Sequence, residues 1–152
     1  MNYWLMKSEP SEFGIDDLFH KPNRTEHWDG VRNYQARNMM RDEMKIGDQV
    51  FFYHSNCDEP GIVGIMEVIR EGYPDFLAFD PKDKHFDPKS DPDNPRWFMV
   101  DVKHVRTLSR TITLKELKQH PQLETLALVR RGNRLSIMPV SKQQWEFILA
   151  LE

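Results

Sequence analysis

The feature that most constrains the fold is the shortness of the apolar segments. Five segments rich in aromatic and branched residues lie at 3–7, 49–54, 62–70, 97–105 and 135–140, each bounded by proline, glycine or polar residues. Alternation of apolar and polar residues in 97–105 is typical of a strand with one buried face. The first half of 62–70 is apolar on both faces, which predicts a central strand.

Helix signals lie before and after these strands. The expected helices span residues 11–19, 33–45 and 113–120, with a closing helix that follows Ser141. Ser11 is the expected N-cap of the first helix. Thr113 with Glu116, and Ser141 with Gln144, have the spacing of a capping box.

Two segments are expected to be loops. Residues 20–30 are polar and irregular, and residues 80–95 are rich in proline and lack branched aliphatic side chains. A long loop in a compact domain is usually functional or mobile. Short strands with helices placed early and late predict one α+β domain over residues 1–152, a small closed or half-closed barrel with flanking helices.

Composition restricts the cellular compartment expected for the chain and the kinds of site that it can form. The net charge is −3, and Cys57 is the only cysteine, so neither an internal disulfide nor a cysteine zinc site can form. The six histidines are scattered, and we expect no metal and no cofactor. The N-terminus lacks signal-peptide features, and no apolar run approaches the ~20 residues that span a bilayer. We therefore expect a cytoplasmic monomer without a membrane partner.

Charge is unevenly placed along the chain. Aspartates gather between residues 75 and 93, whereas arginines gather at 24–41 and at 130–134. A total near zero can therefore conceal one basic face, which is the electrostatic signature of a nucleic-acid contact. We expect this basic face to surround a pocket at the strand ends that hold Lys7 and Tyr53.

Five segments resemble the EVE domain family. They are YWLMKSEP at 3–10, WDGVRNYQARNMMRDEMKIGDQVFFYHS at 28–55, GIVGIMEVIREGYPD at 61–75, RWFMVDVKHV at 96–105 and LSIMPVSKQQWEFIL at 135–149. The resemblance implies a PUA-like pseudo-barrel, grouped with YTH and ASCH domains. It also implies binding of a modified nucleobase.

A weaker similarity to YTH domains suggests where the base is bound. Those domains place a Lys-Ser pair at the end of the first strand, where this chain has Lys7 and Ser8. They also place a cage tryptophan before a polar turn, where this chain has Trp28. Their second cage tryptophan has no counterpart, and Tyr73 or Phe76 is the nearest candidate. The resemblance implies a base pocket but does not support methyladenine recognition of the YTH type.

The expected ligand-binding residues form three groups. Trp28 would stack an extruded base, although a large aromatic residue can also simply close one end of a barrel. Lys7, Ser8 and Glu9 provide a cation, a hydroxyl and a carboxylate for a base edge, although such residues often only end a strand.

The remaining candidates lie at the start of a helix and the end of a strand. Asn33 and Tyr34 begin the expected 33–45 helix, where an Asn amide can read a base edge or simply cap the helix. Tyr53 and His54 end the 49–54 strand. A pairing of His54 with Cys57 for catalysis is not expected, because no third residue orients the histidine.

Four arginines are the expected phosphate contacts. They are Arg32, Arg130, Arg131 and Arg134, because a guanidinium can bind phosphate through two parallel hydrogen bonds. The function expected from these features is a non-catalytic module that recognises a modified nucleobase in DNA or RNA. The base would be extruded from its strand into an aromatic pocket.

The alternative is an amidohydrolase acting on a free acylated pyrimidine nucleoside. Some ASCH-type relatives use a lysine, a hydroxyl residue and a glutamate for this reaction. Lys7, Ser8 and either Glu9 or Glu67 would fill those roles.

Overall fold

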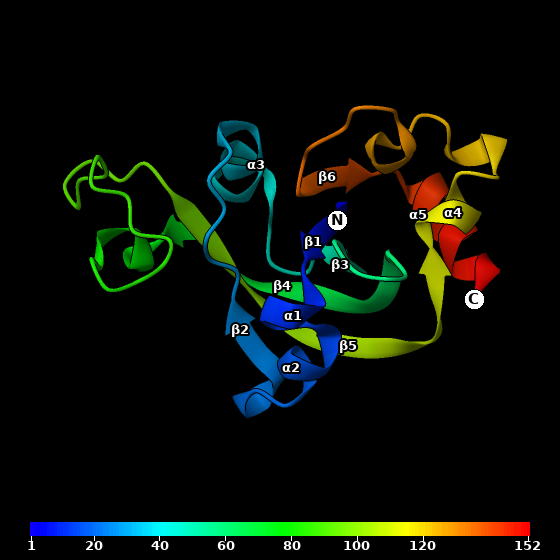
Figure 1. Cartoon of the computed structure of the whole chain (residues 1–152), viewed down its shortest axis with the longest axis horizontal. Coiled ribbons are helices and arrows are strands. Elements are labelled where there is room, and N and C mark those ends of the chain that lie inside the picture. The colour runs from blue at the N-terminus through cyan, green and yellow to red at the C-terminus, as the bar shows by residue number, and fades with distance from the viewer.

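A six-stranded mixed sheet forms the centre of the molecule in the computed structural model, which describes residues 1–152 (Figure 1). Its strands are β1 (Tyr3–Ser8), β2 (Thr25–His27), β3 (Gln49–His54), β4 (Gly61–Pro74), β5 (Phe98–Thr113) and β6 (Ile137–Val140). They lie in the order β2-β5-β4-β3-β1-β6, and only β1 and β3 run parallel. This parallel pair aligns Lys7 with Tyr53 and Ser8 with His54, so polar residues from both strand ends meet.

Short helices lie around the sheet (Figure 1). They are α1 (Pro10–Phe13), α2 (Ile15–Phe19), α3 (Tyr34–Asn38), α4 (Leu114–Leu117) and α5 (Lys142–Leu151), with 3₁₀ turns at Pro22–Arg24, Phe76–Phe79, Pro121–Leu123 and Ala127–Val129. The expected capping box of α5 is confirmed: Ser141 Oγ accepts from the Gln144 amide at 3.1 Å, and Gln144 Oε1 accepts from the Ser141 amide at 2.9 Å. Thr113 caps α4 through the Glu116 amide.

Each face of the sheet carries an apolar core. In β1, Trp4 and Met6 belong to one core and Leu5 to the other, because successive side chains of a strand point to opposite faces. In the second core, Trp145 of α5 stacks on Phe51 of β3, with ring centroids 3.8 Å apart. β4 lies between β3 and β5, so the central strand expected from its two apolar faces is confirmed.

The two longest strands bend the sheet into a partly closed barrel. Register shifts interrupt the pairing of β4 with β5 at four places, and such bulges increase local twist and curvature. A Cβ on Gly64 of β4 would lie 2.7 Å from Ile15 Cδ1, so the glycine allows α2 to pack directly on the strand. The edge strands β2 and β6 do not pair with each other, so the expected closed or half-closed barrel takes the half-closed form.

Two strand predictions need correction. The expected loop at 20–30 contains β2, whose residues pair with 101–103 of β5. Its composition is polar because β2 is a short edge strand that buries none of its residues fully. The strand expected at 97–105 continues to Thr113 as β5. The C-terminal half of β5, residues 106–113, pairs with the start of β4.

Two helix predictions also need correction. The helix expected at 33–45 changes after Asn38 into a π-helical turn, Met39–Glu43, where the Met44 amide donates to the Met39 carbonyl. The helix expected at 11–19 breaks at Gly14, and Glu9 rather than Ser11 occupies the first N-cap position. The spacing of apolar residues in the sequence does not indicate irregular hydrogen bonding of this kind.

Residues 80–95 run irregularly over the surface, as predicted, and none of them is buried. This segment is part of the green loop that extends away from the strands in Figure 1. None of the helices combines the length and the apolar character needed to cross a bilayer.

Candidate nucleic-acid interface

A hollow of about 660 Å³ opens beside the end of β1. We call it the Trp28 pocket. It is lined by Lys7, Ser8, Glu9, Glu12, Phe13, Glu26, His27, Trp28, Asp29, Gly30, Val31, Arg32, Lys84, His85 and Ser136. These residues come from β1 and α1, from β2 and the connection that follows it, from the 80–95 loop, and, for Ser136, from the segment just before β6. The structure therefore brings together Lys7, Ser8, Glu9 and Trp28, four of the predicted ligand residues.

Trp28 is part of the core as well as part of the pocket wall. Its ring meets Phe13 and Phe52 edge-on, with centroids 6.2 and 5.4 Å away, and only 7% of the residue is exposed. Its backbone amide donates to the Val100 carbonyl at 2.8 Å. A ring held in this way is rigid, and only its small exposed part lines the pocket.

The polar residues at the end of β1 already have partners within the protein. Ser8 Oγ donates to the Phe13 carbonyl at 2.6 Å, and Glu9 Oε1 accepts from Asn56 Nδ2 at 2.7 Å. The hydroxyl oxygen of Ser8 and the second carboxylate oxygen of Glu9 retain capacity to accept. This end of the pocket is therefore fixed in place and rich in acceptors.

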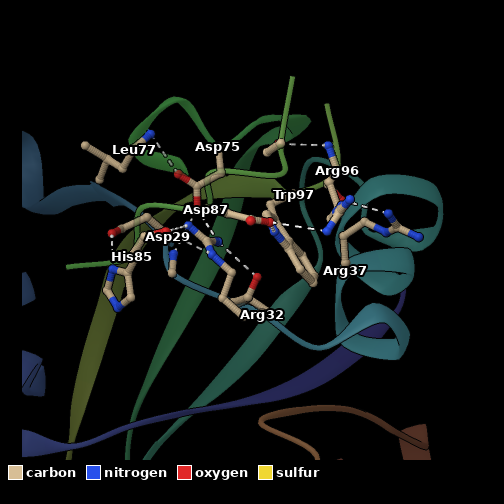
Figure 2. Close-up of polar contacts among 12 residues, drawn as sticks. Asp29, Arg32, Arg37, Asp75, Leu77, His85, Asp87, Arg96 and Trp97 are labelled. Carbon is tan, nitrogen blue, oxygen red and sulfur yellow. Dashed lines mark hydrogen bonds and ion pairs between the residues drawn. The ribbon is translucent and has the colours of Figure 1, made fainter. Parts of the chain in front are cut away.

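Asp75 joins two walls of the pocket (Figure 2). Its fully buried carboxylate accepts from the Gly30 amide at 2.9 Å, from Arg32 Nη1 at 3.0 Å and from the Leu77 amide at 3.0 Å. Arg32 also donates to the His85 carbonyl from Nε at 3.2 Å and from Nη2 at 2.6 Å. Arg32, one of the predicted phosphate contacts, therefore braces the 80–95 loop against the pocket.

A second set of contacts holds the far end of this loop (Figure 2). Trp97 Nε1 donates to Asp87 Oδ2 at 2.6 Å, and Arg96 lies 3.6 Å from the same carboxylate. Hydrogen bonding to Trp97 lowers the pKa of Asp87 below its usual range. Arg37 donates to the Arg96 carbonyl at 2.7 Å. The loop is thus tied to α3 and to the start of β5.

His85 and Lys84 of the 80–95 loop line the pocket, and neither residue was predicted from the sequence. A Cβ on Gly30 would lie 2.5 Å from the His85 ring, so the ring lies directly against the Gly30 backbone. His85 Nδ1 lies 3.5 Å from carboxylate oxygens of both Asp29 and Asp83. Lys84 forms an ion pair with Glu12 of α1. The only signal in the sequence was the length of the loop.

A second hollow, of about 910 Å³, lies on the other side of Lys7. We call it the arginine groove. It is lined by Lys7, Tyr53, Leu114, Lys118, Gln119, His120, Pro121, Glu124, Leu128, Val129, Arg130, Arg131, Gly132 and Asn133. The arginines of the 130–134 cluster thus adjoin the strand ends that hold Lys7 and Tyr53, whereas no arginine of the 24–41 cluster lines this groove. Arg134 is exposed in the same loop but does not line the groove.

Lys7 is the one residue that lines both hollows. Its Nζ lies 5.8 Å from the centroid of the Tyr53 ring, and burial lowers the pKa of Lys7. Tyr53 is almost fully buried, which raises its pKa to about 12. Tyr53 therefore remains a neutral phenol beneath the lysine.

Besides Tyr53, which lines the arginine groove, three predicted ligand residues lie outside the Trp28 pocket. Asn33 Oδ1 accepts from the Ala36 amide at 2.9 Å, so its side chain caps α3. Tyr34 is exposed and stacks on Trp97, with centroids 4.9 Å apart. His54 Nε2 accepts from the Ile15 amide at 3.1 Å, and burial lowers the pKa of His54. All three have structural contacts.

The two candidates for a second cage ring lie at different places. The Tyr73 hydroxyl donates to Asp101 at 2.5 Å, which leaves it away from the pocket. Phe76 is half exposed and meets His27 edge-on at 5.5 Å. Since His27 lines the Trp28 pocket, Phe76 is the candidate nearer to its rim.

The residues named for a hydrolase do not form one cluster with Glu67. Glu67 pairs with Gln49 at one end of β3, whereas Ser8 pairs with His54 at the other end. The five residue steps from Gln49 to His54 separate Glu67 from Ser8 by about 16 Å along the strand. No three His, Cys, Asp or Glu side chains are grouped closely enough to hold a metal ion.

Comparison with known proteins identifies the family. Residues 2–151 match the EVE domain. Thymocyte nuclear protein 1 of zebrafish (Danio rerio) is 51% identical, over 98% of this chain and 71% of the zebrafish protein. The human protein of that name is 47% identical, over 99% of this chain and 74% of its own length.

Solved structures agree with this assignment. A Pseudomonas syringae protein superposes with a TM-score of 0.94 at 50% identity, over 98% of each chain. Human THYN1 in complex with 5-methylcytosine containing DNA superposes with a TM-score of 0.95 at 46% identity, over 99% of this chain and 97% of that one. An ASCH protein of Zymomonas mobilis shares the fold with a TM-score of 0.58 at 10% identity, over 99% of each chain. The predicted PUA-like α+β fold is therefore confirmed, and this chain belongs to the EVE domain family.

Proposed function

We propose that this protein is a non-catalytic module that binds DNA carrying a modified cytosine, with the modified base held in the Trp28 pocket. One observation carries the proposal. Human THYN1, which superposes on nearly the whole chain at 46% identity, has been solved with 5-methylcytosine containing DNA.

The charges around the Trp28 pocket favour a neutral ligand over an anion. Carboxylates of Glu9, Glu12, Glu26 and Asp29 stand among its lining residues, together with the cations of Lys7, Arg32 and Lys84. Glu12 is already paired with Lys84, and Arg32 with buried Asp75. Glu26 is paired with Lys21, so a phosphate would meet two carboxylates without a Lys or Arg partner, Glu9 and Asp29. A base offers donors and acceptors that suit such a mixed site.

The pocket also suits the shape and the edge of a methylated cytosine. The ring of Trp28 supports stacking, and Phe13 and Val31 add apolar surface for a methyl group. The cytosine N4 amine would donate a hydrogen bond to the carboxylate of Asp29 or Glu9, and Lys7 would donate to the acceptors of the same base.

Entry into this pocket requires the base to leave its stack. A base inside a duplex cannot reach a recessed wall of aromatic and charged residues, so it must be flipped out or lie in a single strand. Unstacking costs a few kcal/mol, and the cost is lowest where the strand is already unpaired. We therefore expect an unpaired methylated strand to bind more tightly than the same sequence in duplex.

Anisotropy titrations of matched strands test the proposal. The strands are a 5-methylcytosine oligonucleotide, the same sequence with cytosine, and the RNA counterpart. We expect preference for the methylated strand, and Trp28→Ala should remove roughly 1–3 kcal/mol from binding of that strand alone. Trp28→Phe keeps a ring against Phe13 and Phe52 and should retain part of the preference.

Phe19→Ala is the control, because it removes an exposed ring outside the pocket. Thermal unfolding checks that each variant is folded. Equal binding of methylated and plain strands by the wild-type protein, or an unchanged preference in folded Trp28→Ala, would overturn the proposal.

A further inference from the structure

The arginines of the chain fall into two groups by their contacts. Eight of the eleven contact an acid, a backbone carbonyl or an aromatic ring, namely Arg24, Arg32, Arg37, Arg41, Arg70, Arg96, Arg106 and Arg110. No hydrogen bond, ion pair or ring contact is found for the side chains of Arg130, Arg131 and Arg134. The unused guanidinium groups are therefore gathered in one loop.

This loop edges the arginine groove, where two further cations lie. Arg130 and Arg131 line the groove with Lys118 and Lys7, and Glu124 is the only acid among its lining residues. Lys118 is exposed and has no acidic partner. A free cation stays hydrated in water, but several on one concave surface create a field that attracts a polyanion.

A second observation points to a ligand at the same loop. Asn133 Nδ2 is shielded from solvent and has no hydrogen-bond partner in the protein, although Asn133 Oδ1 accepts from the Leu135 amide. Buried donors are normally paired, so an unpaired one calls for an explanation. Gly132, beside it, has φ of +79° and nothing within 4 Å of the position of a Cβ. The tip of the loop is thus open at Gly132, and Asn133 Nδ2 becomes an available donor only when its side chain turns outward.

Lys7 connects the groove to the Trp28 pocket, because its side chain lines both. We propose that the arginine groove binds the sugar-phosphate chain that flanks the extruded base, so that the ligand is an unpaired DNA strand that passes over Lys7. This inference rests on the proposed function and adds the class of ligand, a polynucleotide rather than a free nucleoside. The base lies on one side of Lys7 and the next phosphates on the other.

The two hollows then divide affinity from selectivity. Phosphate contacts do not depend on base identity, whereas contacts in the Trp28 pocket do. Loss of groove cations must therefore weaken methylated and plain strands equally. It must also lower the salt dependence of binding, because each phosphate contact on a single strand contributes ~0.7 to the slope of log K against log salt.

The test compares two double variants of equal charge. Arg130→Ala/Arg131→Ala removes two free cations, and Arg41→Ala/Arg106→Ala removes two exposed arginines that are paired with Asp42 and Glu152. Binding of the 5-methylcytosine strand and the plain strand is titrated at several salt concentrations. We expect the first variant to lose about 1.4 from the salt slope, with its preference for methylcytosine unchanged. The second variant should keep the wild-type slope.

A nucleoside arm separates this inference from the proposed function. Binding of 5-methyl-2′-deoxycytidine alone should be equal in the wild-type protein and the Arg130→Ala/Arg131→Ala variant, and weaker in Trp28→Ala. Equal salt slopes in the two double variants would overturn the groove while leaving the base pocket intact. A groove variant that lost its preference for methylcytosine, with plain-strand affinity unchanged, would also overturn it.

Discussion

The Trp28 pocket and the arginine groove share Lys7 but differ in how their polar groups are used. In the pocket, Arg32 and Lys84 are bound to carboxylates of the protein. In the groove, the guanidinium groups of Arg130 and Arg131 have no hydrogen-bond or ion-pair partner. Under the proposed function, the first arrangement would fix a shape for one kind of base, and the second would leave charge available for any strand. Selectivity and affinity would then depend on different elements of one small fold.

The pocket depends on contacts that are distant in sequence, which makes it the more fragile region. Arg32 reaches Asp75 across 43 residues and the His85 carbonyl across 53. Gly30 and Leu77 are joined through the same carboxylate. The groove arginines lie together in one loop, so their proximity does not depend on contacts between distant residues.

The largest expected effect is that of Asp75→Ala. Removing this buried carboxylate leaves Arg32 and two amides without their acceptor, and breaking a buried ion pair costs about 3 kcal/mol or more. Chemical denaturation should show that loss. Methylcytosine preference should fall as the 80–95 wall loosens, while the salt slope of DNA binding stays unchanged.

Asp42→Ala is the matched control, because Asp42 is an exposed carboxylate paired with Arg41. A surface pair of this kind contributes about 0–1 kcal/mol. If the two alanine variants were equally stable, the network around Asp75 would not be what fixes the pocket.

A smaller effect distinguishes two glycines with the same backbone conformation. Gly30 and Gly132 both have φ of +79°, so alanine at either site should cost roughly 1–2 kcal/mol of stability. At Gly30 the new Cβ would also lie 2.5 Å from the His85 ring, whereas at Gly132 it would meet nothing within 4 Å.

Gly30→Ala should therefore displace His85 and reduce methylcytosine preference, whereas Gly132→Ala should leave that preference as in the wild type. Anisotropy titrations of both variants with methylated and plain strands give the measurement. Equal loss of preference in the two variants would mean that His85 does not form part of the functional pocket wall.

The regular parts of the fold could be predicted because their signals are local. The apolar runs of β1 and β3, the alternation within β5 and the Ser141–Gln144 capping box are set by residues a few positions apart. Trp28 and the Lys7–Glu9 segment were found through resemblance to a family, and the structure places them in one pocket. The arginine loop was found from charge alone.

The remainder of the site could not be predicted because it depends on distant partners. Nothing near Arg32 in sequence indicates that buried Asp75 and the His85 carbonyl bind its guanidinium. His85 and Lys84 reach the pocket in a loop that is held by Arg32 at the His85 carbonyl and by Trp97 at Asp87. β2 is too short and too polar to show a strand pattern.

The most direct test of the central claim follows the indole N–H signals of the four tryptophans by NMR during titration with a short 5-methylcytosine strand. Trp28→Phe assigns the Trp28 signal. The account requires that signal to shift with saturation and to shift less with the plain strand. The Trp145 signal, on the opposite core, should stay in place. Saturable binding of the methylated strand that leaves the Trp28 signal unmoved would contradict the claim.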